Sequence, residues 1–185
     1  FASAVIPVMR GHAEMTLHQR MQSDLAFAFD AMGRDTAISP ECVILRPEAE
    51  SAIAPTSATL ALLLNIPAPE PETDEHGASQ WVIYYTGDSR LRRVILDGAE
   101  VNEYLKQLEL GESPETGVPG AGVTMIENLA AFYVMAPSDG GPLIRVEAQA
   151  AQEKYRRNFQ ARTSTAWALA PGAKIREIPV REKRP

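Results

Sequence analysis

The sequence has little that could support catalysis, a metal site or a disulfide. It contains one cysteine, Cys42, among 185 residues, which excludes an internal disulfide. Because its neighbours are aliphatic, we expect Cys42 to be a small buried hydrophobic residue. Only three histidines are present. His12 and His18 are too far out of phase to share one side of a helix, and His76 lies in an acidic segment. None of them has the spacing of a paired metal ligand.

Signatures of catalytic sites are also missing. There is no nucleophile elbow, phosphate-binding loop or dinucleotide fingerprint, and the glycine-rich segment Val118–Val123 lacks the lysine and hydroxyl residue that a phosphate loop needs. The acidic stretch Glu70–Glu75 lacks the alternating aspartates of a calcium loop, so we interpret it as a solvated loop. The sequence therefore predicts a protein that is not an enzyme, with no catalytic residue, no cofactor and no metal.

Positive charge is scarce as well. The formal net charge is -6, which argues against a nucleic-acid partner, because binding phosphates calls for a basic face. The basic pairs Arg92-Arg93 and Arg156-Arg157 fall in or next to expected strands, and we interpret them as solvated edge positions and not as an anion site. Fourteen prolines and twelve glycines indicate many turns, and therefore more sheet than helix.

No apolar run reaches the roughly 20 residues that span a bilayer. The chain nevertheless starts with nine mostly apolar residues, which could begin a buried element or end a membrane helix. Their larger side chains would surround a helix on all sides, which favours the membrane interpretation. We then expect about 10–15 further apolar residues upstream in the native protein. The larger side chains of this membrane-proximal segment are those of Phe1, Val5, Ile6, Val8 and Met9.

Beyond this start the apolar pattern becomes one-sided. Apolar residues recur every three or four positions, which predicts an amphipathic helix over about residues 10–34, with Gly33 and Pro40 as stop signals. We expect its apolar stripe to pack against a sheet. The residues of this helix packing stripe are Leu17, Met21, Leu25, Ala28 and Met32.

The rest of the chain reads as short β-rich runs between turn residues. Two hairpins are expected, one around Thr86–Ser89 and one around Pro137–Gly141, with exposed loops over 67–79 and 112–122 and a short helix over 101–110. The expected strands cover residues 41–45, 59–66, 81–85, 91–96, 129–136, 143–150, 159–169 and 174–180.

This order predicts a single α+β domain over 1–185, in which a long N-terminal amphipathic helix packs on an antiparallel β-sheet. The helix would cover 1–35, a β head 36–171, and a C-terminal extension 172–185. A second possibility is an immunoglobulin-like β-sandwich head with an N-terminal helix.

Four segments resemble minor pilins and pseudopilins of type IV pilus and type II secretion systems, especially the J-type pseudopilins and W-type minor pilins. They are the helix end Met21–Asp35, the tyrosine-bearing hairpin Trp81–Gly98, the strand Ile126–Met135 and the closing strand Asn158–Pro171. The resemblance covers nearly the whole chain, but it rests on patterns and not on signature motifs. It implies a pilin-like fold.

The resemblance also implies a non-catalytic assembly subunit of the bacterial cell envelope, anchored in the inner membrane with a periplasmic or cell-surface head. Its partners would be other pilin or pseudopilin subunits and inner-membrane assembly proteins. An adhesin-like binding module is the alternative, which an exposed apolar patch away from the helix would favour. A periplasmic enzyme is a third hypothesis, and it would need a pocket with converging titratable groups.

Overall fold

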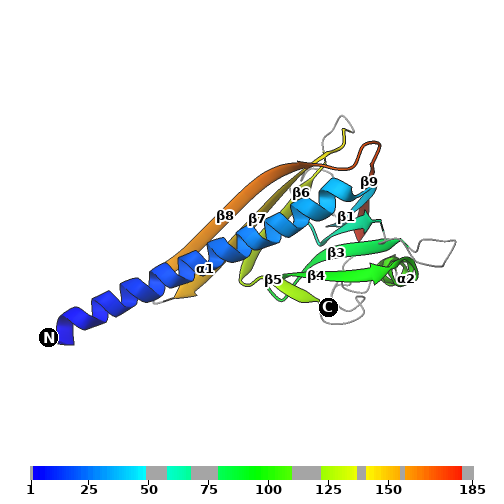
Figure 1. Ribbon diagram of the computed structural model, residues 1–185. Coiled ribbons are helices and arrows are strands. Elements are labelled where there is room, and N and C mark those ends of the chain that lie inside the picture. The colour runs from blue at the N-terminus through cyan, green and yellow to red at the C-terminus, as the bar shows by residue number, and fades with distance from the viewer. Residues whose placement is uncertain are drawn as a thin grey trace, which may run out of the picture.

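The computed structural model has one long helix, two β-sheets and a second, short helix (Figure 1). It describes residues 2–48, 58–67, 79–109, 122–136, 141–154 and 157–180, without the side chains of 2–12, 109 and 157. In chain order the elements are α1 (Ala2–Ile38), β1 (Glu41–Pro47), β2 (Ala61–Ile66), β3 (Gln80–Gly87), β4 (Arg90–Asp97), α2 (Gly98–Glu109), β5 (Val123–Ile126), β6 (Leu129–Met135), β7 (Leu143–Lys154), β8 (Arg157–Ala168) and β9 (Lys174–Val180).

The fold is α+β with an N-terminal helix and mainly antiparallel strands, as predicted, but the strands form two sheets and not one. Six strands form one sheet in the order β5-β4-β3-β2-β1-β9, and three strands form another in the order β6-β7-β8. One pair, β1 with β9, is parallel. Lys174 N–H donates to the carbonyl of Pro40, so β9 starts beside the start of β1 and runs with it.

Helix α1 extends further than predicted at its C-terminal end. Gly33 does not stop it, and the helix continues to Ile38, two residues before Pro40. A proline disfavours helical backbone in the residue before it, which accounts for the end at this point. The indole of Trp167 on β8 explains why residue 33 is a glycine, because a Cβ added at that position would lie 2.9 Å from Trp167 Nε1. Glycine here permits close packing of helix and strand.

Two apolar cores lie on opposite faces of the six-stranded sheet. The first is shared by α1 and both sheets, and the second lies between the six-stranded sheet and α2. Strand β1 contributes to both, because Cys42 and Ile44 face the first core while Val43 and Leu45 face the second. Burial on both faces is the reason that this strand is a continuous apolar run and not an alternating one.

The helix packing stripe lies in the first core. Met21, Leu25, Ala28 and Met32 are buried, and Leu17 is partly buried against the same cluster. Helix α1 also packs on β8, where the rings of Phe29 and Trp167 lie with centroids 5.3 Å apart. Figure 1 shows the first part of α1 running out beyond both sheets toward the N-terminus.

Most predicted strands are present, and the first hairpin is confirmed. Strands β3 and β4 pair from Gln80↔Asp97 to Gly87↔Arg90 around the two-residue turn Asp88-Ser89. Both turn residues have positive φ, of 46° and 55°, which is typical of a type I′ turn. The second hairpin pairs β6 with β7, although most of its turn lies outside the described residues. Strand β5 was missed, because it has only four residues and follows a segment expected to be a loop.

The short helix α2 is confirmed and starts earlier than predicted. Asp97 and Glu100 form a capping box: Asp97 Oδ1 accepts from the N–H groups of Ala99 and Glu100, and Glu100 Oε2 accepts from the N–H of Asp97. The pair Asp97-Gly98, which is typical of a turn, is therefore the start of the helix here. The exposed loop 67–79, the loop 112–122 and the C-terminal tail fall largely outside the described residues.

Candidate functional site: a hollow beside a partly buried ion pair

The C-terminal half of α1 is tied to the six-stranded sheet by a cluster of three polar side chains. Asp35 on α1 accepts hydrogen bonds through Oδ2 from the Tyr84 hydroxyl at 2.5 Å, and from Arg93 Nε at 3.1 Å and Nη2 at 3.0 Å. Arg93 Nε also lies 3.2 Å from the Tyr84 hydroxyl oxygen. We call these three residues the α1–sheet latch. Hairpin register places Tyr84 and Arg93 directly opposite each other on β3 and β4.

The latch is largely shielded from water. The side chains of Arg93 and Asp35 are 26% and 14% exposed. Burial, and then the hydrogen bond to Asp35, raise the pKa of Tyr84 far above its ordinary value. Tyr84 is therefore a neutral donor, and Asp35 is occupied as an acceptor by both partners. This arrangement holds the helix on the sheet, and it lacks an activated nucleophile or a free base.

Arg93 corrects the interpretation of the pair Arg92-Arg93 as solvated edge positions. Strand β4 is not an edge, because β5 pairs beyond it, and Arg93 forms an ion pair with Asp35. The Arg92 guanidinium lies 3.9 Å from the Asp88 carboxylate. The pair Arg156-Arg157 lies outside the described side chains.

Beside the latch, an apolar hollow opens between α1 and β5. Its volume is about 390 Å³, and Asp35 and Arg93 of the latch form part of its lining. Phe27 and Val123, two of its lining residues, are 58% and 67% exposed although both are large and apolar. The other lining residues are Ala31, Arg34 and Met125. We call this feature the α1–β5 hollow. Its exposed apolar residues beside fixed charges are typical of a contact surface for a protein partner.

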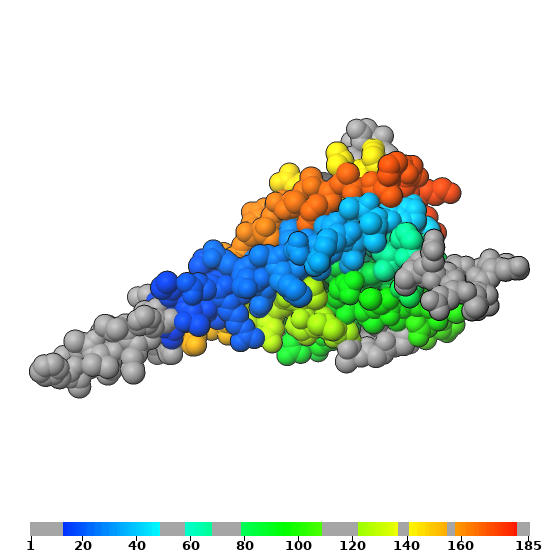
Figure 2. Space-filling view, in the orientation of Figure 1, coloured from blue at the N-terminus to red at the C-terminus, as the bar shows by residue number. Residues whose placement is uncertain are grey.

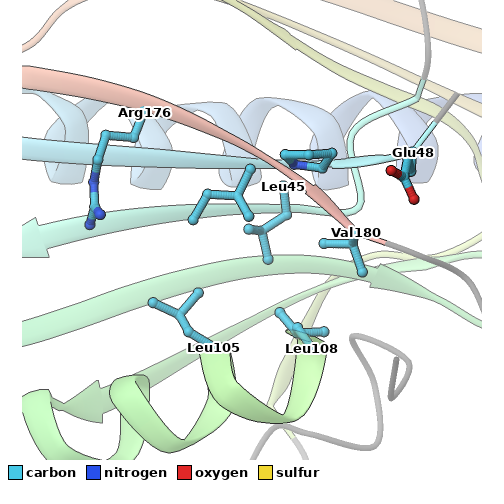
Figure 3. A pocket seen from close by; sticks show the side chains of 8 residues that line it. Leu45, Glu48, Leu105, Leu108, Arg176 and Val180 are labelled. Atoms are coloured by element: carbon cyan, nitrogen blue, oxygen red, sulfur yellow. The ribbon is translucent and has the colours of Figure 1, made fainter. Parts of the chain in front are cut away.

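A second hollow, of about 340 Å³, lies between α2 and strands β1 and β9 (Figure 3). Leu45, Leu105, Leu108 and Val180 converge there, three of them buried in the second core, so this hollow is a margin of that core. Arg176 at its rim is paired with Glu41 at 2.6 Å. The Arg176 guanidinium is therefore already paired and is not a free charge for a ligand in this hollow.

The predicted site residues are distributed along α1. The packing stripe is in the core, whereas the side chains of the membrane-proximal segment lie outside the described ones. In the part of the chain that the structure describes, no three His, Cys, Asp or Glu residues come together as a metal site. The acidic stretch Glu70–Glu75 and His76 are outside that part. Within the same part, no helix is long and apolar enough to cross a membrane.

Sequence reasoning missed the latch and the hollow. The sequence does contain a signal for the pairing of Tyr84 with Arg93, because a two-residue turn at Asp88-Ser89 places these residues opposite each other. The contribution of Asp35 is a long-range contact that local patterns do not reveal. Comparisons with models of known families, with curated proteins and with solved structures found no match.

Proposed function

We propose that this protein is a non-catalytic structural subunit that assembles through α1 into a filament like a type IV pilus or a type II secretion pseudopilus. The observation that carries the proposal is the helix itself. Its 37 residues correspond to about 55 Å, and among the side chains that the structure describes, those from about Leu17 onward pack on the two sheets. The remainder runs out beyond them (Figure 1). A helix whose C-terminal part is held on the sheets while its N-terminal part runs beyond them suits packing against sister helices.

The sequence of the N-terminal part supports this use. Residues 2–9 are apolar apart from Ser3 and include one proline, whereas the helix turns polar from Arg10 onward. Such a helix could lie in a membrane before assembly and among other helices afterwards. The partners would be other pilin or pseudopilin subunits and inner-membrane assembly proteins. The location would be the bacterial envelope, with the sheets on the periplasmic or outer side.

The α1–sheet latch suits a subunit that carries load. Force applied along α1 reaches the six-stranded sheet through Asp35, Tyr84 and Arg93, and reaches the three-stranded sheet through Trp167 packed over Phe29 and Gly33. The helix is thus fixed to both sheets near its C-terminal end. Fixing at two places keeps the head in one orientation on the helix, which a regular filament requires.

The adhesin-like alternative is less well supported. It would be favoured by an apolar patch away from α1. Among the described residues, the large exposed apolar side chains away from α1 and its hollow are Ile95 and Leu143, which lie on different sheets. The α1–β5 hollow, in contrast, is built on the helix and fits a contact between subunits.

The proposal is tested in cells of the source organism with an antibody against the protein. We expect it in the cell-envelope fraction and in filaments or secretion assemblies purified from it, and we expect loss of the gene to reduce filament number or secretion. Restoring the wild-type gene should reverse that loss. A protein that is found only free of envelope and filaments, and whose loss leaves both processes intact, would contradict the proposal.

A further inference from the structure

Helix α1 carries a second line of residues outside its packing stripe. They are spaced by four, three and four positions, which places them on one side of the helix and is the spacing of a seam between packed helices. Phe27 and Ile38, at the two ends of this line, are 58% and 52% exposed. We call this set the outer stripe of α1, and its residues are Phe27, Ala31, Arg34 and Ile38.

The outer stripe and strand β5 together form a groove. Phe27, Ala31 and Arg34 line the α1–β5 hollow from the helix. Val123 and Met125 line it from the strand. Figure 2 shows α1 at the surface of the molecule, with β5 bordering it on one side and β8 on the other. A groove that has the seam spacing along one wall suits a second helix, laid along α1 with its apolar side chains in the hollow.

The charged residues that line this groove are already paired. Arg34 forms an ion pair with Asp30 at 3.0 Å. Asp35 and Arg93 pair with each other in the α1–sheet latch, also at 3.0 Å. A charged partner would have to compete with one of these pairs, whereas an uncharged apolar helix would leave both intact. The groove therefore favours a helix that is apolar and carries no charge.

The first nine residues of this chain have that chemistry. They include no charged side chain, and Ser3 is their only polar one. They cannot reach the groove of their own chain, because α1 is one continuous helix in which Ile6 precedes Phe27 by 21 residues, or about 31 Å along the axis. The groove of another copy is within reach, since the N-terminal part of α1 runs out beyond both sheets (Figure 1).

We propose that residues 1–9 of one copy pack in the groove of a second copy, along the outer stripe and Val123. This inference rests on the proposed function and adds to it the two surfaces that meet. Because they are different surfaces of the same molecule, each contact leaves one N-terminal segment and one groove unoccupied, so the contact repeats from copy to copy. A contact of this kind that does not close into a ring builds a filament from one kind of subunit.

Cysteine cross-linking in filaments of the full chain tests this contact. After oxidation, the variant Ile6→Cys/Val123→Cys should give a ladder of dimers, trimers and longer chains on a denaturing gel, because every copy contributes both partners. The matched control is Ile6→Cys/Leu143→Cys, which should give no ladder, since Leu143 is similarly exposed but lies on the three-stranded sheet. The native Cys42 is buried and should not take part.

A second matched pair tests the groove itself. Ala31→Arg, added to the first cross-linking variant, places a long side chain in the groove and should reduce the ladder about tenfold. Ala37→Arg, at an exposed position of α1 outside the outer stripe, should leave the ladder unchanged. Thermal melts show whether each variant folds.

The outcomes separate this inference from the proposed function. Normal filaments without a ladder, or with equal ladders in the test and control variants, would overturn the inference and leave the proposed function standing. A cross-link from position 123 to a different protein would also overturn the inference alone. Absence of the protein from filaments would overturn both.

Discussion

At the residue scale, the α1–sheet latch places three polar groups where an apolar core would be simpler. Tyr84 is fully buried, and its hydroxyl needs an acceptor, which Asp35 supplies. Asp35 in turn needs a counter-charge, which Arg93 supplies. Each of the three groups is thus a hydrogen-bond partner of another. Removing one of them leaves a partly buried polar group without its partner. This mutual dependence fixes the position of the helix more specifically than apolar contacts alone.

We predict that Tyr84→Phe lowers the free energy of unfolding by about 1.5–3 kcal/mol, because a hydrogen bond to a charged group has that typical magnitude. The control is Tyr133→Phe, because the structure records no hydrogen bond between the Tyr133 hydroxyl and any described residue. Urea unfolding of both variants measures the difference. Equal effects of the two substitutions would show that the hydroxyl of Tyr84 contributes nothing to the latch.

Cys42 gives a prediction for pH. Burial in the first core, and then the carboxylates of Glu177 and Glu41, raise the pKa of the Cys42 thiol to about 12. In the unfolded chain a thiol ionises near pH 8.5. The folded state therefore holds this proton more tightly, and its contribution to stability is complete below about pH 8.5 and is lost as the pH rises toward 12.

We therefore expect the wild type to lose more stability than Cys42→Ala between pH 7.5 and pH 9.5. The difference should reach about 1 kcal/mol, since a fully effective proton changes stability by about 1.4 kcal/mol per pH unit. Urea unfolding at the two pH values measures this difference. Because each protein is compared with itself at the other pH, the cost of the cavity that Cys42→Ala leaves cancels. Identical pH dependence in both proteins, or rapid alkylation of Cys42 in the native state, would show that the thiol is accessible.

At the element scale, Gly33 shows how a tertiary contact can override a local signal. Replacing a helical glycine by alanine normally stabilises a helix by about 1 kcal/mol. Here the added Cβ would meet the ring of Trp167, which packs against Phe29. We predict that Gly33→Ala destabilises the protein and that the same change becomes stabilising when combined with Trp167→Leu. Thermal melts of the two single variants and the double variant give the coupling directly.

The packing stripe of α1 provides a second prediction for the helix. Leu25 is buried in the first core, so Leu25→Ala should cost about 2–5 kcal/mol. Gln22, one turn earlier, is exposed, and its amide lies 3.0 Å from His18 Nε2 on the same helix. Gln22→Ala should therefore shift the melting temperature little. Small and equal shifts for the two variants would mean that this part of α1 separates from the sheets in solution.

The elements themselves were largely predictable, because their signals are local. The β3–β4 hairpin follows from aromatic and β-branched arms around Gly87-Asp88, and the capping box that starts α2 is visible as Asp97 and Glu100 three residues apart. Strand β5 was not predictable from its four residues, since its place depends on pairing with β4. The end of α1 was misplaced because a glycine in a helix has the same sequence signal whether it caps the helix or permits close packing.

At the scale of the whole molecule, the arrangement of the strands could not be read from the sequence. The split into two sheets depends on contacts such as the bonds between Thr59 and β6, and the parallel pairing of β9 depends on where the chain passes the end of α1. These contacts join residues far apart in the chain. The same holds for the candidate site, where Phe27 from α1 and Val123 from β5 line one hollow.

The α1–β5 hollow gives the prediction for assembly. Phe27 and Val123 are large, apolar and more than half exposed, so truncating either should change the free energy of unfolding by no more than about 0.5 kcal/mol. If the hollow is a contact between subunits, Phe27→Ala and Val123→Ala should each weaken assembly at least tenfold, or about 1.4 kcal/mol, because exposed aromatic and aliphatic anchors carry much of the energy of an interface.

The matched control for this assembly test is Leu143→Ala, which removes a similarly exposed side chain from the three-stranded sheet. It should leave both stability and assembly unchanged. The measurement is the fraction of each variant that sediments with purified filaments, together with a thermal melt of the isolated protein. Normal assembly of Phe27→Ala alongside failure of Leu143→Ala would move the subunit contact from α1 to the three-stranded sheet. That outcome would leave the hollow without a role in assembly, because its exposed apolar side chains would then be dispensable.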